Sequence, residues 1–322
     1  MGSSITGADG ASDSSSQSPA PTQGAAADPP APAADPMDAS DGAGMDGDAP
    51  AGDDEPAEDA APQPSTPAVE VELPTTMESP GVAPWFNVYR PMDLDAIEGP
   101  LPIVVWANGG CYRSDFTWAP LFERWAAAGF VVLALTESPD GGALAQTSVG
   151  DHGALIDWAL GQAEYTEKLD PERVVAAGNS CGGITALGLA ADDARVAAVF
   201  VLSGSSSVFG ADVSVMSAVT VPVGYVVGGS EDIAAANAAA DYEALSDGVP
   251  AMIVSRSSGD HRTVSTDTMI LPDVAEIALN WMDLTLHGTA AAAQALGSAD
   301  VCGSCEPGVW SMMGKHLETL EQ

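Results

Sequence analysis

Apolar residues fall into two alternating patterns from about residue 80 onward. Short, nearly continuous apolar runs rich in Val, Ile and Leu are typical of strands that are buried on both faces of a sheet. Such runs occur at 85–91, 101–110, 131–138, 173–180, 196–204, 221–229 and 251–259. Because helix-like segments separate many of these runs, the pattern predicts an α/β protein with a mostly parallel, twisted sheet and helices on both faces.

The segments between the runs repeat apolar residues three or four positions apart, which is the period of a helix. They predict a helix that ends at Gly129 and further helices over 152–163, 182–193 and 272–288. In parallel sheets, reacting groups gather at the carboxyl ends of the strands. The residues that directly follow each strand are therefore the candidates for chemistry.

The composition changes near residue 66. Residues 1–66 are mainly Ala, Asp, Pro, Gly and Ser, and no Lys or Arg occurs among residues 1–80. Such a segment buries too little apolar surface to offset the entropy of ordering the chain. We predict that residues 1–66 form a disordered acidic stalk or linker, and that residues 67–322 form one catalytic domain of ordinary size.

The formal net charge of −37 disfavours several classes of binding partner. Nucleic-acid binding is disfavoured because no basic patch is present to neutralise phosphates. Anionic membrane surfaces are disfavoured for the same reason. No stretch of about 18 apolar residues occurs, so the sequence predicts no transmembrane segment. The acidity fits either a salty habitat or simple solubility.

One short motif stands at a predicted strand-to-helix junction. The residues Gly178-Asn179-Ser180-Cys181-Gly182 form a G-x-S-x-G pattern. A serine on so sharp a turn needs glycine two residues away on either side, because larger side chains would collide. The turn exposes the hydroxyl and places the next amide at a helix N-terminus, where an oxyanion is stabilised. A chance match in a chain rich in Gly and Ser is the alternative, but the junction favours Ser180 as a nucleophile.

A serine nucleophile needs a base, and the chain has four histidines. His261 follows the last predicted strand of the series and comes late enough for the order Ser, acid, His. His152 precedes the nucleophile, His287 lies in the last turn of a helix where a cation suits the dipole, and His316 lies in the C-terminal tail. We therefore expect His261 to be the base.

The acid should follow a strand between the nucleophile and the base. Glu231 and Asp232 both follow the predicted strand 221–229, and Asp232 directly precedes a helix-like segment. We favour Asp232 and keep Glu231 as the alternative, whereas Asp260 should point away from the adjacent His261. The acid would hold the imidazole tautomer and stabilise the imidazolium.

An oxyanion hole needs two N–H donors. The amide of Cys181 supplies one, and the loop after an early strand supplies the other. Asn108-Gly109-Gly110 lets the backbone approach a bound carbonyl, so Gly110 is the expected donor, with Cys111 next.

The four cysteines form two candidate pairs. Cys111 and Cys181 end neighbouring predicted strands, which brings them within reach of a disulfide that would fix the oxyanion hole; two buried thiols are the alternative. Cys302 and Cys305 form a C-x-x-C in the C-terminal region, for which we expect a local disulfide. A zinc site there would lack ligands, because His316 alone would not complete it. No metal site is predicted.

These features resemble the α/β-hydrolase superfamily. The stretches VVWANGGC, GNSCGG, GGSED and GDHRT occur in that family's order across roughly residues 85–290. FNVYRPMDL and AGFVVLAL resemble the exported esterases of the cutinase, polyester hydrolase and dienelactone-hydrolase-like branches. The resemblance implies an α/β-hydrolase fold and a serine carboxylesterase without a cofactor. The chain differs from the polyester hydrolases at Gly110 and Asn179, where those enzymes carry an aromatic residue or, before the serine, an aromatic or histidine.

The sequence thus predicts a hydrolase of small or polymeric carboxylic esters that acts as a monomer. Cys111, Tyr112 and Trp118 are candidates for contact with the substrate, and Trp85 is a further aromatic candidate. Two alternatives stay open. One is a peptidase or acyltransferase that uses the same catalytic triad of Ser180, His261 and Asp232, and the other is a non-catalytic surface binding module on the same fold. Disulfides fit an exported protein that is secreted, periplasmic or held at the cell surface, including a lipid-anchored bacterial lipoprotein.

Overall fold

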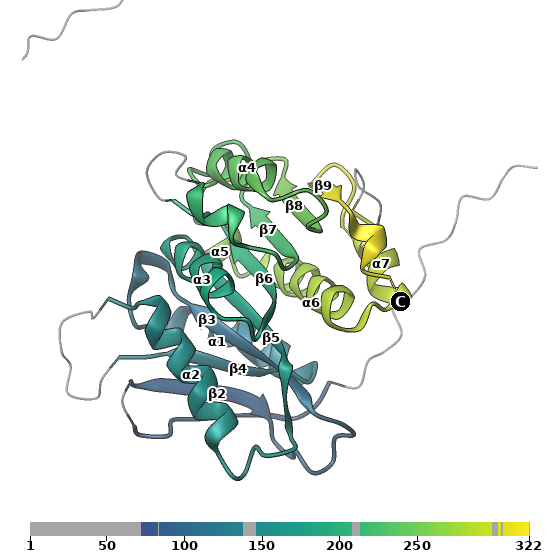
Figure 1. Ribbon diagram of the computed structural model, residues 1–322. Helices are drawn as coiled ribbons and strands as arrows, with labels where there is room; N and C mark the ends of the chain where they lie inside the picture. The colour runs from purple at the N-terminus through teal and green to yellow at the C-terminus, as the bar shows by residue number, and fades with distance from the viewer. Residues whose placement is uncertain are drawn as a thin grey trace, which may run out of the picture. The chain divides into compact units, whose positions relative to one another are not determined.

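The computed structural model describes residues 72–82, 84–137, 146–207, 213–297, 302–303 and 305–321. The predicted stalk, residues 1–66, lies outside these ranges. The described residues form a mixed α/β arrangement in which a nine-stranded sheet has helices on both faces (Figure 1). This confirms the α/β class and the mostly parallel sheet predicted from the alternating pattern.

The strand order in the sheet is β1-β2-β4-β3-β5-β6-β7-β8-β9. The pairings β1/β2, β2/β4 and β8/β9 are antiparallel, and the remaining pairings are parallel. The strands are β1 (Thr75–Glu78), β2 (Phe86–Pro91), β3 (Leu101–Ala107), β4 (Val131–Leu135), β5 (Leu169–Asn179), β6 (Val196–Leu202), β7 (Val223–Val227), β8 (Ala251–Arg256) and β9 (Trp310–Lys315).

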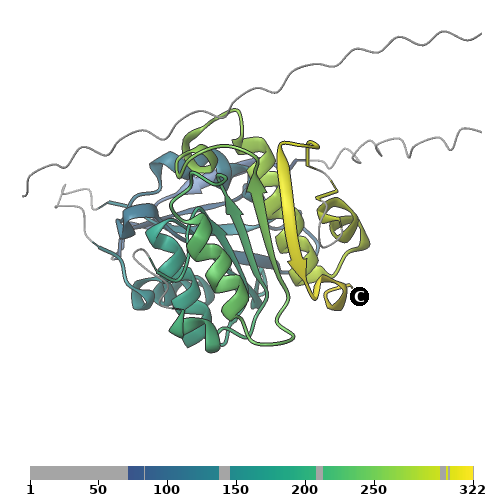
Figure 2. The same cartoon turned by 90° about the horizontal axis from the view of Figure 1, so that it is seen from above.

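Helices cover both faces of the sheet, and Figure 2 shows the same layers from above. They are α1 (Ala119–Ala127), α2 (Val149–Gly161), α3 (Cys181–Asp192), α4 (Ala235–Ala244), α5 (Thr263–Thr266), α6 (Leu271–His287) and α7 (Ala290–Leu296). Residues of α2, α3 and α4 share one apolar core with the sheet, and residues of α1, α6 and α7 share the other.

The central strands explain why the sheet is buried on both faces. Every residue of β3 is buried. Side chains alternate along a strand, so Ile103 and Val105 enter the core with α2 and α3, whereas Val104 and Trp106 enter the core with α1 and α6. The apolar run without polar alternation is the consequence of this double burial.

Element boundaries differ from the predicted ones for local reasons. The predicted strand 101–110 ends at Ala107, because the glycines beyond it form a short 3-10 turn. Helix α2 begins at Val149, three residues earlier than predicted. There Ser148 and Asp151 form a capping box, in which each side chain accepts the other's backbone N–H. Strands β1 and β9 and helices α5 and α7 were not predicted.

Candidate active site

Ser180 stands alone between the last residue of β5 and the first residue of α3. Its backbone has φ 52° and ψ −120°, a conformation that L-residues rarely adopt. A Cβ at Gly178 would lie 2.4 Å from the carbonyl oxygen of Gly182, and a Cβ at Gly182 would lie 1.9 Å from that of Ala107. Glycine is therefore required on both sides of this serine, as the motif predicted.

His261 connects Ser180 to a carboxylate. Its Nε2 lies 2.8 Å from Ser180 Oγ, and its Nδ1 lies 2.8 Å from Asp232 Oδ1. The loop after β8 carries the histidine, and the loop after β7 carries the aspartate, so the three side chains meet at the carboxyl edge of the sheet. The structure thus brings together the three residues that the sequence predicted.

Asp232 is buried and accepts hydrogen bonds on both carboxylate oxygens. Besides His261, its donors are the N–H groups of Gly228 and Ala234, both at 2.9 Å, and the hydroxyl of Ser203 at 2.6 Å. Burial by itself would raise the pKa of this carboxyl, but the four hydrogen bonds together lower it to about 2. Asp232 is therefore negatively charged at neutral pH and suited to face an imidazolium.

Two other carboxylates, those of Glu231 and Asp260, form no hydrogen bond with His261 among the described residues. Glu231 is exposed, and its backbone forms a bridge with Asp260. The carboxylate of Asp260 accepts the backbone N–H of Arg262 and the hydroxyl of Thr263, both at 3.0 Å. It therefore turns into its own loop, as expected. The geometry favours Asp232 over Glu231 as the partner of His261.

The loop after β3 packs directly against the turn at Ser180. It contains Asn108 and the 3-10 turn Gly109–Cys111, in which Gly110 has φ 68° and Cys111 has φ 53°. A disulfide joins Cys111 to Cys181, with their Cα atoms 5.2 Å apart. Cys181 is also the first residue of α3, where backbone N–H groups have no partner within the helix. Backbone amides of both segments are therefore placed beside Ser180.

The second predicted disulfide is also present, between Cys302 and Cys305. This disulfide lies near α7. The proximity is seen at Gly303, between the two cysteines, where an added Cβ would lie 2.3 Å from the carbonyl oxygen of Gln294. It thus belongs to the C-terminal region and not to the loops that carry the triad.

The aromatic candidates for substrate contact have different environments. Tyr112 is 38% exposed and lies next to Gly110 in the loop after β3. Trp118 is buried, packs against Trp106 with ring centroids 4.8 Å apart, and donates its indole N–H to Asn108 Oδ1 at 2.8 Å. Trp118 therefore packs in the core and holds Asn108 of the loop after β3, whereas Tyr112 is accessible to a ligand.

Two of the other histidines, His152 and His287, have side-chain partners away from His261 and Ser180. His152 is buried in α2 with Nδ1 2.9 Å from Ser148 O and Nε2 3.2 Å from Trp106 O. Burial lowers its pKa. His287 lies in the last turn of α6 and contacts Asp283 at 2.9 Å.

Ser203 is a residue of the site that the sequence pattern did not predict. This serine follows β6 and donates its hydroxyl to the same oxygen of Asp232 that accepts the N–H of Gly228. Its φ of 39° is a further conformation that is uncommon outside glycine. A signal existed, because a polar residue directly follows a buried strand that pairs with β5, but serines also follow other strands and turns of this chain.

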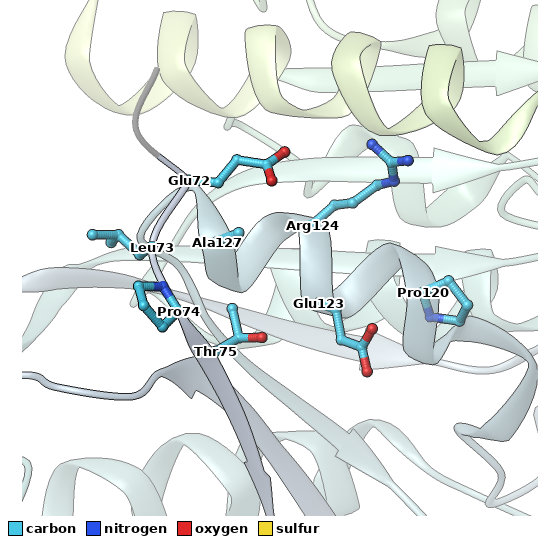
Figure 3. Close-up of a pocket in the computed structure, with 8 residues that line it drawn as sticks. All are labelled: Glu72, Leu73, Pro74, Thr75, Pro120, Glu123, Arg124 and Ala127. Atoms are coloured by element: carbon cyan, nitrogen blue, oxygen red, sulfur yellow. The ribbon is translucent and has the colours of Figure 1, made fainter. Parts of the chain in front are cut away.

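Figure 3 shows a hollow beside α1, lined by Glu72, Leu73, Pro74, Thr75, Pro120, Glu123, Arg124 and Ala127. None of these residues belongs to the triad or to the loop after β3. Within the described ranges, no group of three or more His, Cys, Asp or Glu residues could hold a metal ion. No helix in the same ranges has the length and hydrophobicity needed to cross a bilayer.

Comparison of the sequence with protein-family models and with curated proteins gave no match.

Proposed function

We propose that this protein is a serine hydrolase of the α/β-hydrolase type that cleaves carboxylic esters through an acyl-enzyme. One observation carries the proposal: His261 Nε2 lies 2.8 Å from the hydroxyl of a serine on a strained turn, while its Nδ1 is held by a buried carboxylate. Nucleophile, base and orienting acid in this relation define a Ser-His-Asp triad.

In the proposed reaction, Ser180 Oγ attacks the ester carbonyl carbon while His261 Nε2 takes its proton. Negative charge develops on the carbonyl oxygen, which the N–H of Cys181 and the N–H of Gly110 or Cys111 stabilise. The imidazolium then gives its proton to the leaving alkoxide as the C–O bond breaks. Water, deprotonated by His261, attacks the acyl-enzyme. The imidazolium returns this proton to Ser180 Oγ as the acyl C–O bond breaks, which releases the acid and free Ser180.

Asp232 serves this cycle without gaining a proton. Its hydrogen bond fixes the tautomer in which Nε2 faces the serine, and its charge stabilises the imidazolium between the two proton transfers. A pKa lowered to about 2 keeps the carboxylate charged throughout the range in which a histidine can act as a base.

The aligned triad also favours catalysis over a non-catalytic binding module. A binding surface has no need for a serine in an uncommon backbone conformation, which costs free energy on the order of 1–3 kcal/mol. The two disulfides support the proposal that the enzyme works in an oxidising compartment, either secreted, periplasmic or at the cell surface.

The test uses the full chain and its Ser180→Ala variant. Initial rates are measured with p-nitrophenyl esters of graded acyl length and with matched peptide p-nitroanilides. We expect ester turnover that falls by several orders of magnitude in Ser180→Ala. Preferred turnover of the anilides would instead identify a peptidase. Absence of turnover with every substrate, or equal rates in the two proteins, would contradict the proposal.

A further inference from the structure

A bend of four small residues, Ser203-Gly204-Ser205-Ser206, follows β6 and is buried throughout. Connecting segments usually run over the surface, because buried backbone and hydroxyl groups need hydrogen-bond partners. The exposed fractions here are 0% for Ser203, 4% for Ser205 and 8% for Ser206. The partners of these residues show what the bend holds in place.

The first residue of the bend contacts the triad acid. Ser203 Oγ donates to Asp232 Oδ2 at 2.6 Å, and the N–H of Ser203 donates to Val226 O at 2.8 Å. The second bond ties the serine backbone to β7, the strand that leads to Asp232. The hydroxyl is thereby fixed at the oxygen of Asp232 that does not contact His261.

The next residue of the bend contacts the nucleophile. A Cβ at Gly204 would lie 2.7 Å from the carbonyl oxygen of Ser180 and 3.0 Å from its amide nitrogen. The amide of Ser180 itself donates to Leu202 O at 3.0 Å, directly before the bend. The bend thus lies against the backbone of the strained turn on one side and against the triad acid on the other.

The last residue of the bend is anchored from α4. Asp241, which is 1% exposed, accepts the backbone N–H of Ser206 at 2.6 Å and also its hydroxyl. Tyr225 donates its hydroxyl to the same carboxylate at 3.3 Å. Within the described hydrogen bonds, the partners of Asp241 are uncharged groups, and two of these three bonds come from Ser206 of the bend.

From these contacts we infer that Ser203 is a positioning residue for Asp232, held by a bend that also braces the Ser180 turn. The inference rests on the proposed function. Loss of the hydroxyl leaves Asp232 with one donor fewer, so its carboxylate binds the protonated imidazole more strongly and is less firmly oriented. The predicted effect is on kcat and on its pH dependence, with KM unchanged.

The substitutions Ser203→Ala and Ser203→Gly distinguish the effect of losing the hydroxyl from the effect of changing the backbone strain. Alanine keeps the Cβ of serine and therefore the same backbone strain, so Ser203→Ala removes only the hydroxyl, whereas glycine adopts a positive φ without strain. We expect both variants to lose about tenfold in kcat, as for one lost hydrogen bond, and both to shift the acid limb of the kcat/KM pH profile to higher pH. Ser217→Ala, at an exposed serine outside the bend, is the matched control and should behave as the unmodified protein.

If Ser203→Gly keeps the kcat and the pH profile of the unmodified protein, the hydroxyl has no positioning role and the inference is wrong. A second measurement does not depend on turnover: the low-field proton NMR signal of His261 Nδ1–H, assigned by its loss in His261→Gln. We expect it to shift in both Ser203 variants and not in Ser217→Ala. A shift in a protein that hydrolyses no ester would refute the proposed function and leave the inference standing; an unchanged signal in both variants would refute the inference.

Discussion

Cys111 and Cys181 are joined across 70 residues by a disulfide that links the loop after β3 to the residue directly after Ser180. The two segments it connects are those whose amides we propose as oxyanion donors. Glycine packing brings these segments together, since a Cβ at Gly182 would collide with Ala107 O and one at Gly109 would lie 2.6 Å from Asn179 Oδ1. The covalent link adds to this contact and limits how far the two donors can separate.

Replacing this disulfide should therefore lower kcat. In Cys111→Ser/Cys181→Ser we expect a loss on the order of tenfold to a hundredfold, because displacing an oxyanion donor costs up to 10²–10³-fold. The loop-closure entropy of a 70-residue separation also predicts a loss of about 4 kcal/mol in the free energy of unfolding. Ester kinetics and urea denaturation measure the two effects.

The matched control is Cys302→Ser/Cys305→Ser, which removes a disulfide between residues only three apart in the sequence. It should leave kcat unchanged and alter stability less. A folded Cys111→Ser/Cys181→Ser protein with unchanged kcat would show that the glycine contacts alone hold the two segments.

Gly182→Ala should abolish most activity. The added Cβ would lie 1.9 Å from Ala107 O, so the turn or the loop after β3 must move. A displacement of about 1 Å at a reacting group costs about a hundredfold in rate. In Gly161→Ala, at the end of α2, the Cβ meets no atom within 4 Å, so that variant should keep its activity and change stability by less than about 1 kcal/mol. Equal kinetics for the two variants would count against the described turn.

Asp232→Asn should retain the fold near neutral pH and lose about 10⁴-fold in kcat, because an amide can favour the wrong tautomer of His261. Stability at low pH gives a second measure. The folded-state pKa of Asp232 is about 2, below its usual 3.8, so its stabilising effect is present above 3.8 and is lost as the pH falls toward 2. Between pH 3.8 and about 2, the urea midpoint of unfolding should therefore depend less on pH in Asp232→Asn than in the unmodified protein.

For Asp241 we predict the opposite pH dependence of the free energy of unfolding. Burial raises its pKa above the usual 3.8, so the native state favours the protonated carboxyl, and this stability is lost as the pH rises through the raised value. Asn at this position can accept the N–H of Ser206 and donate to its hydroxyl without carrying a charge. Relative to the unmodified protein, Asp241→Asn should thus gain stability as the pH rises above about 4. Urea denaturation at several pH values measures this; a difference that is independent of pH would contradict it.

The sequence was sufficient to predict three side chains that the structure brings together, those of Ser180, Asp232 and His261. Ser180 was identified because glycine spacing, a buried strand and a helix coincide at one position, and steric exclusion makes that combination specific. His261 was identified because it follows a strand at the carboxyl edge of a parallel sheet. The strand pattern also predicted the layers, since strands buried on both faces need continuous apolar sequence.

Some features that depend on tertiary contacts were not predicted. Ser203 is one serine among many, and its importance arises only when β6 and β7 pair and bring its hydroxyl to Asp232. Strand β9 alternates buried residues such as Trp310 and Met312 with exposed ones, a short pattern whose pairing with β8 the sequence does not specify. The burial of Asp241 likewise depends on the position of α4 over the bend.

The central claim is that Ser180 is a nucleophile activated by His261. The most direct test is to treat the full chain with a fluorophosphonate, measure the intact mass and locate the adduct by peptide mass spectrometry. We predict one adduct on Ser180, which is absent in Ser180→Ala and forms far more slowly in His261→Gln. No adduct, or an adduct that persists in Ser180→Ala, would contradict it.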